Sequence, residues 1–167
     1  MPASGRAEGV PCWLDHRRGN VEVESAVWIG RVGDLPGPVV FQPPASESAL
    51  LQCASSLGHP LPADLVALLR ESNGIEGEYE AGLVWSAERI ASENRTFRDD
   101  GELATLYMPF DPLLFFADAG NGDLFALLPG LQRPDVFIWN HEDDSRTWVA
   151  PSLAKYLESW LTGQIKL

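Results

Sequence analysis

PLLFFADAGNGDLFALL, which spans residues 112–128, contains two apolar runs on either side of a short glycine-rich segment. Each run, 112–117 and 123–128, has the length and composition of a buried strand. Between them, Gly120-Asn-Gly122 can adopt positive φ angles, which suit a tight turn between antiparallel strands. These glycines do not resemble a phosphate-binding loop, because no lysine is near and a strand rather than a helix follows. The segment therefore predicts a β-hairpin.

Two further strand signals follow the hairpin. Residues 135–139 and 146–149 are apolar and aromatic, and the polar segment 140–145 separates them. Four consecutive strands joined by short turns predict an antiparallel meander. Trp139 and Trp148 flank the last turn and could pair across the two strands.

Helical spacing of apolar residues marks three segments before the hairpin and one after it. They are residues 46–57, 62–72, 86 to about 100, and 152–162. In the first helix the expected inward residues are Leu50, Leu51, Ala54 and Leu57. The expected N-caps are serines (Ser46 or Ser48, Ser86 and Ser152), and the expected stops are Gly58, Asn73-Gly74 and Gly163. Together these patterns predict an α+β fold, an antiparallel β-meander with helices packed against one sheet.

The first part of the chain is distinct from this pattern. Alternation at Val21–Glu24 and the apolar residues after it predict a strand near 21–31, and residues 39–41 predict a short second strand. We expect residues 1–44 to be a variable N-terminal segment, either adding short strands or forming an extension. Residues 45–167 are then the main domain.

Charge limits the classes of partner. The 167 residues contain 24 acids and 12 bases, giving a net charge of −12. Nucleic acids and anionic membranes repel such a surface, whereas a basic protein is attracted to it. The simpler alternative is that the net charge serves only to keep the protein soluble. We therefore expect a protein partner, no nucleic acid and no membrane.

The sequence also bears on the compartment. No apolar run approaches the roughly 20 residues that span a bilayer. The first ten residues contain no apolar core of a secretory leader. Cys12 and Cys53 are far apart and form no Cys-x-x-Cys pair, which favours reduced thiols over a disulfide or zinc site. A cytoplasmic protein is expected.

Catalytic and metal-binding patterns are weak. Cys53 and His59 could be a nucleophile and base, but a buried thiol and a surface histidine fit better. The run from His141 to Asp144 lacks the alternating ligand spacing of a calcium loop. Acids at strand ends, such as Asp118 and Asp123, are typical of turns. We therefore predict no enzyme, no cofactor and no metal site.

An ordered set of motifs between residues 47 and 163 resembles the SUKH superfamily, which includes yeast Smi/Knr-type cell-wall regulators and bacterial immunity proteins. Its pieces are Leu57-Gly-x-Pro-Leu-Pro62, Leu65-x-x-Leu-Leu, Ser72-Asn-Gly74, Trp85-Ser86 with Glu88, Ile90 and Asn94, Phe115-Phe-Ala-Asp-x-Gly-x-Gly-Asp123, Trp139-Asn-His-Glu-Asp143 and Leu153-x-x-Tyr-Leu-x-x-Trp-Leu161. The resemblance implies that residues 45–167 are a SUKH-like domain and that it is a binding module. It supplies no shared catalytic or binding-site motif.

Three functions are considered, two implied by the resemblance and one suggested by the residues alone. The first is an immunity protein that neutralises a bacterial toxin, such as a nuclease, by non-covalent binding. The second is a cytosolic regulator or scaffold of the Smi/Knr type with no toxin partner. The third, argued from the residues alone, is a hydrolase that uses Asp118, Asp123 and Glu142.

For an immunity protein, acidic loops are the natural contacts with a basic toxin. The predicted contact residues are two groups of acids and one aromatic residue: Glu76, Glu78, Glu80, Glu142, Asp143, Asp144 and Trp85. Among the six tryptophans, one or two are expected to be exposed as interface anchors, since tryptophan is enriched at binding hot spots.

Overall fold

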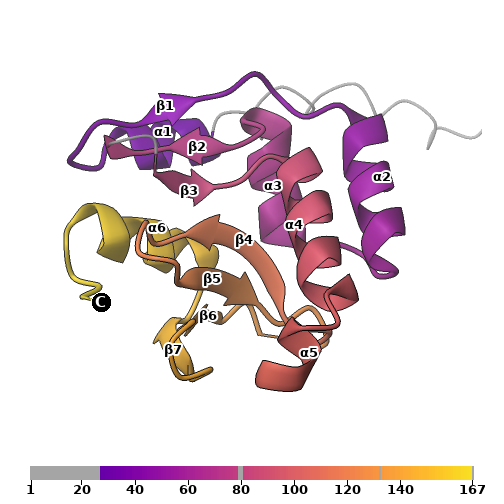
Figure 1. Cartoon of the computed structure of the whole chain (residues 1–167). Coiled ribbons are helices and arrows are strands. Elements are labelled where there is room, and N and C mark those ends of the chain that lie inside the picture. The colour runs from indigo at the N-terminus through magenta and orange to yellow at the C-terminus, as the bar shows by residue number, and fades with distance from the viewer. Residues whose placement is uncertain (1–26, 79–80, 132, 167) are drawn as a thin grey trace, which may run out of the picture.

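The structure, a computed structural model, describes residues 27–78, 81–131 and 133–166. Figure 1 shows the arrangement of their helices and strands. In chain order the elements are α1 (Val27–Gly33), β1 (Val40–Phe41), α2 (Glu47–Leu57), α3 (Ala63–Glu71), β2 (Ile75–Glu76), β3 (Gly82–Val84), α4 (Ala87–Asp99), α5 (Leu103–Leu106), β4 (Leu114–Asp118), β5 (Leu124–Leu127), β6 (Val136–Trp139), β7 (Arg146–Ala150) and α6 (Leu153–Leu161).

The predicted meander is confirmed. Strands β4 to β7 form an antiparallel sheet in sequence order. The β4–β5 turn contains Gly120 at φ 81° and Gly122 at φ 103°, values that favour glycine. The expected pairing of Trp139 with Trp148 is wrong, because Trp139 lies opposite Arg146 and Trp148 opposite Phe137.

The four-stranded sheet lies between two helices. Phe115 of β4 packs against Phe97 of α4, with ring centroids 5.1 Å apart. The next residue, Phe116, packs against Tyr156 of α6 at 5.3 Å. Successive strand residues point to opposite faces, so β4 supplies apolar surface to both layers. The α+β class is confirmed, with helices on both faces of this sheet.

A buried side chain, Asn94, bonds helix α4 to β4. Asn94, which is 1 % exposed, accepts the Phe115 amide at 2.9 Å and donates to the Phe115 carbonyl at 2.8 Å. A buried amide that exchanges both bonds with one strand residue sets the position of the helix along the strand.

A second sheet, absent from the sequence prediction, has the order β1-β2-β3. The Trp85 amide donates to the Phe116 carbonyl at 2.7 Å and so connects the end of β3 to β4. This hydrogen-bonded contact between the two sheets is short, because the chain enters helix α4 at Ala87, directly after its capping residue Ser86. The expectation of a single sheet is therefore wrong. The structure has two sheets, which lie side by side.

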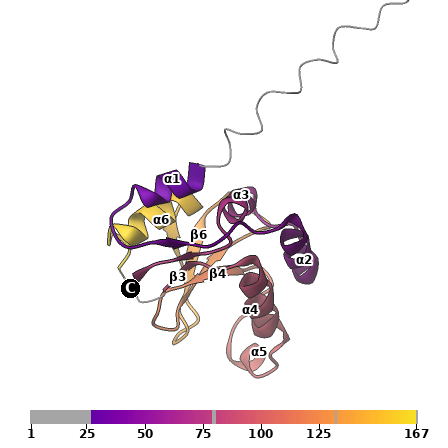
Figure 2. The same cartoon turned by 90° about the horizontal axis from the view of Figure 1, so that it is seen from above.

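The described part of the N-terminal segment, residues 27–44, packs against the rest of the chain. Residues 40–41 form β1 and pair with β2, as the short second strand predicted. A strand near 21–31 is wrong for residues 27–31, which belong to α1; the earlier residues lie outside the described part. Trp28 and Val32 lie one helical turn apart and are buried, and Glu71 accepts the Trp28 amide at 2.8 Å. Figure 2 shows α1 from above. The division at residue 44 stays a prediction.

The predicted boundaries of α2 are confirmed, but one inward residue is not. Ser46 caps the helix by accepting the Ala49 amide, and Gly58 ends it at φ 73°. Leu51 is 69 % exposed, whereas Cys53 is 1 % exposed. The buried face therefore runs through Leu50, Cys53 and Leu57.

Candidate functional site

The β6–β7 turn is built around the carboxylate of Asp144. Its Oδ1 accepts the indole N–H of Trp139 at 2.7 Å, and its Oδ2 accepts the Met108 amide at 2.7 Å. The Arg146 guanidinium lies 3.4 Å away. Burial raises the pKa of Asp144, but these hydrogen bonds and Arg146 outweigh it and hold the pKa below its usual value. Asp144, a predicted contact residue, is thus occupied by contacts within the protein.

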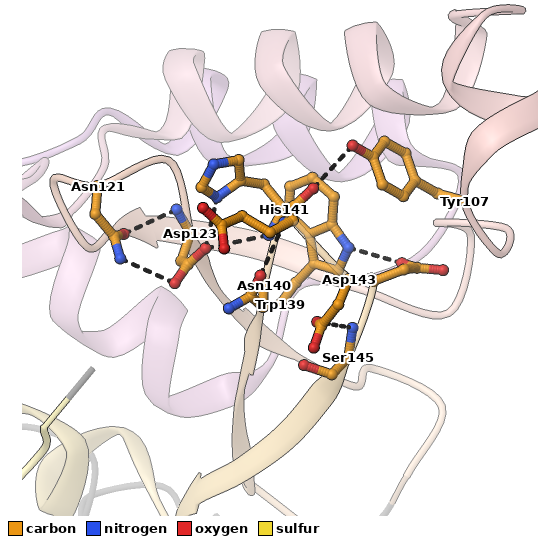
Figure 3. Close-up of polar contacts among 10 residues, drawn as sticks. Tyr107, Asn121, Asp123, Trp139, Asn140, His141, Asp143 and Ser145 are labelled. Atoms are coloured by element: carbon orange, nitrogen blue, oxygen red, sulfur yellow. Dashed lines mark hydrogen bonds and ion pairs between the residues drawn. The ribbon is translucent and has the colours of Figure 1, made fainter.

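Asp123 holds the opposite side of the same turn (Figure 3). Its Oδ1 lies 2.7 Å from the His141 ring nitrogen Nδ1 and accepts the His141 amide at 3.1 Å. Asn121 donates to the other oxygen at 3.0 Å. Burial raises the pKa of Asp123, yet the bonds from His141 and Asn121 lower it below the usual value overall. The carboxylate therefore fixes the turn.

Close packing explains why this turn is rigid. A Cβ on Gly122 would lie 3.0 Å from the His141 ring. On the other side, the Tyr107 hydroxyl donates to the His141 carbonyl at 2.9 Å. The ring and backbone of His141 are thus held from two directions, as Figure 3 shows.

Two predicted acids on this turn are exposed. Glu142 has no side-chain partner among the described residues, and its backbone is held by Asn140. Asp143 is also exposed, and it accepts the Ser145 amide at 2.9 Å. Hydrogen bonding to Ser145 lowers the pKa of Asp143, so the side chain is charged at neutral pH. A rigid turn thus carries two carboxylates into solvent.

The second group of predicted acids surrounds the β2–β3 connection. Glu76 lies in β2 and is partly buried, Glu78 is exposed, and Glu80 lies outside the described residues. Glu76 is opposite Gly82 in the strand pairing.

Trp85, the predicted aromatic contact, is only 3 % exposed. Its indole N–H donates to Asp118 at 2.8 Å. Arg89 covers the ring, with its guanidinium carbon 4.4 Å from the ring centroid, and pairs with Asp118 at 3.2 Å. This cluster is closed and locally neutral, so Trp85 does not offer its ring to a partner.

Both groups of exposed acids lie at one end of the sheets. A Cβ on Gly82 would lie 2.7 Å from Asp118, which places the start of β3 beside the end of β4. Asp118 is opposite Leu124, which is opposite Trp139. The β2–β3 and β6–β7 connections therefore share an end, separated by about three strand spacings, or roughly 15 Å. We call the exposed and partly exposed acids there, Glu76, Glu78, Glu142 and Asp143, the acidic end.

The cleft beside α4 is polar, and its polar side chains form hydrogen bonds within the protein. It has a volume of about 510 Å³ and is lined by residues that include Asn73, Trp85 and Glu88. Asn73 accepts the Ala87 amide at 2.8 Å and donates to Glu88 at 3.0 Å, so it caps α4. Sequence reasoning identified Asn73 only as a helix stop, because its second role depends on a segment 14 residues away.

The residues of the hydrolase hypothesis do not converge. Asp118 is bound by Trp85 and Arg89, Asp123 by His141, and Glu142 faces solvent. Burial, followed by the charge of Glu88, raises the pKa of the Cys53 thiol to about 11, the opposite of an activated nucleophile. Within the described residues, no three metal-ligating side chains come together.

One further property concerns membranes. In the part of the chain that the structure describes, none of the helices has the length and apolar character needed to cross a bilayer.

Comparison with known proteins agrees with the resemblance found in the sequence. Among curated proteins, none matches the chain. A family model described as the SMI1/KNR4 family (SUKH-1) matches residues 44–159, well over half of the 167 residues. The match begins just before α2 and ends within α6, so it covers the four-stranded sheet and the helices on both of its faces. The chain therefore belongs to the SMI1/KNR4 family.

Proposed function

We propose that this chain is an immunity protein that neutralises a toxin, such as a nuclease, by binding it non-covalently through the acidic end. Domains of this family are in general non-catalytic and bind protein partners, which supports a binding role. The observation that carries the proposal is the β6–β7 turn, held by hydrogen bonds within the protein, which places Glu142 and Asp143 in solvent.

The negative charge of the chain supplies a mechanism for inhibiting a nuclease. A nuclease needs a cationic groove for phosphates. Carboxylates fixed in position can occupy such a groove without the entropic cost of ordering a loop. The net charge of −12 speeds the encounter with a cationic partner. The protein therefore acts by occupying the groove and excluding the substrate.

Growth of cells that express a toxin tests the proposal. The toxin domain encoded beside this chain's gene is expressed alone or together with the full chain. Restored growth is the expected result. The proposal fails if the chain gives no protection, or if no neighbouring gene encodes a toxin; a regulator of the Smi/Knr type is then the better description.

A matched pair of variants tests the acidic end. Glu78→Gln, Glu142→Gln and Asp143→Asn together are expected to lower the association rate with the toxin by about tenfold at low salt. The control neutralises exposed acids at the opposite end: Asp64, which lines a depression with the last residues of β5, and Asp99, at the end of α4. Equal loss in both variants would mean that net charge acts without a specific docking site.

A further inference from the structure

Trp148 is exceptional among the tryptophans that the structure describes. It is 52 % exposed, whereas Trp28, Trp85 and Trp139 are 9 % exposed or less, and Trp160 is partly buried. Trp13 lies outside the described residues. Among the described residues, the one hydrogen bond of the Trp148 side chain runs from its indole N–H to Asp135, at 2.9 Å. A large apolar side chain that remains this exposed is suited to an interface.

The face of the sheet on which Trp148 lies follows from the strand register. Arg146 and Trp148 are two residues apart in β7, so their side chains point to the same face. Arg146 stacks on Phe110, with its guanidinium carbon 5.4 Å from the ring centroid. Trp148 therefore lies on the face that packs against the α4–α5 region. Phe137, directly opposite on β6, is partly buried.

Two more exposed apolar residues lie in or just before the segment whose carbonyls Arg146 binds. Met108 is 54 % exposed and Leu106 is 70 % exposed. The Arg146 guanidinium donates to the Met108 carbonyl at 2.7 Å, and the Met108 amide donates to Asp144 at 2.7 Å. The backbone of this segment is thus fixed to the β6–β7 turn, and a partner would not have to order it on binding.

Acids surround this apolar group. Glu142 and Asp143 are exposed on the turn that holds Met108, and Glu102 is exposed at the start of α5. The positively charged guanidinium of Arg146 pairs with Asp144, and the Arg146 side chain is only 18 % exposed. The depression that Lys166 lines opens toward the opposite face of the sheet, because its lining residues Ile138 and Thr147 alternate with Phe137 and Trp148 along their strands. The local potential is therefore negative.

We infer that Leu106, Met108 and Trp148 form the apolar centre of a docking surface, with Glu142 and Asp143 at its rim. We call these five residues the β7 surface. Its occupant is a cationic protein domain that presents an apolar pocket ringed by lysine or arginine. A second copy of the chain is the poorer occupant, because each copy carries −12 and the acidic rims would repel one another. The inference rests on the proposed function and names the anchors of that same interaction.

The test uses the full chain and a catalytically inactive form of the neighbouring toxin domain, with binding measured by calorimetry. Trp148→Ala and Met108→Ser are each expected to weaken binding by about 30-fold or more, the effect of losing a hot-spot side chain. The control is Leu51→Ala, which removes an even more exposed apolar side chain on α2, far from β7 (Figure 1). Thermal melting checks that each variant folds, which is expected because these side chains are largely exposed.

The possible outcomes distinguish a failure of the β7 surface from a failure of the proposed function. If the unchanged chain binds the toxin and Trp148→Ala binds equally well, the β7 surface is overturned while the proposed function stands. If the unchanged chain does not bind, both fail. Sedimentation of the chain alone adds a third outcome: a dimer abolished by Trp148→Ala would identify a second copy as the occupant and overturn the inference.

Discussion

The indole N–H of Trp139 donates to the carboxylate of Asp144 over 2.7 Å, so the last residue of β6 holds the turn that follows it. Asp144 is the residue in this turn with a positive φ, 58°, a conformation that aspartate tolerates better than most residues. The contact links the aromatic cluster around Trp139 to the exposed acids of the turn. The shape of the acidic end therefore depends on a partly buried hydrogen bond.

Removing this carboxylate should destabilise the fold. Asp144→Ala leaves the partly buried Trp139 indole N–H without its acceptor and removes the partner of Arg146, at an expected cost of about 1–3 kcal/mol. Urea unfolding measures the change. The matched control is Glu142→Ala on the same turn, expected to change stability by less than about 0.5 kcal/mol because its side chain is exposed. Equal stability of the two variants would contradict the role given to Asp144.

Stability should also fall in acid. The pKa values of Asp123 and Asp144 are lowered in the folded chain, so the protonated carboxyls fit the native state less well than the unfolded one. Their contribution is complete above the usual carboxyl pKa of 3.8 and is lost as the pH falls through and below it. Urea midpoints between neutral pH and pH ~3 should therefore drop. The drop should be smaller in the Asp123→Asn, Asp144→Asn double variant, and an equal drop would exclude these two residues as its source.

The contact between Gly82 and Asp118 gives a third prediction. A Cβ at Gly82 would lie 2.7 Å from both Asp118 and the Trp85 ring, so Gly82→Ala must displace this cluster. Overpacking of this kind costs about 1–3 kcal/mol. Gly30→Ala is the control, since a Cβ there meets nothing within 4 Å and alanine favours the helix α1. Thermal unfolding should show Gly82→Ala destabilised and Gly30→Ala unchanged or more stable.

Asn94 gives a fourth prediction. Asn94→Ala removes both hydrogen bonds to the backbone of Phe115 and leaves those buried groups unpaired, at a cost of about 2–4 kcal/mol. Ser92→Ala, at an exposed position on the same helix, serves as control. Hydrogen exchange at the Phe115 amide should accelerate in Asn94→Ala, and unchanged protection would mean that other contacts position α4.

Local signals in the sequence were sufficient for much of the fold. The hairpin between residues 112 and 128 was predictable because its apolar runs and its turn glycines are adjacent in the chain. The serine caps of α2, α4 and α6 were predictable for the same reason, because each cap bonds an amide three residues later. These features need no knowledge of tertiary packing.

The features that the sequence analysis missed depend on contacts between residues far apart in the chain. The start of α1 is stabilised by Glu71, 43 residues after Trp28, and the preceding alternation suggested a strand instead. Trp85 is buried because Arg89 and Asp118 close over it, and Asp144 is occupied by Trp139 and Met108. Sequence reasoning placed Glu142, Asp143 and Asp144 on a turn correctly, whereas Glu76, expected in a loop, lies in β2. Only the structure separates the acids that are exposed from those that hold the fold.

The salt dependence of association tests the central claim most directly. The rate at which the full chain binds the inactive toxin domain would be measured by stopped flow between about 0.05 and 0.5 M salt. Electrostatic docking through the acidic end predicts that the rate falls by about tenfold or more, and that Glu142→Gln with Asp143→Asn makes this fall shallower. A rate independent of salt, or a complex that forms equally well without these carboxylates, would contradict the account.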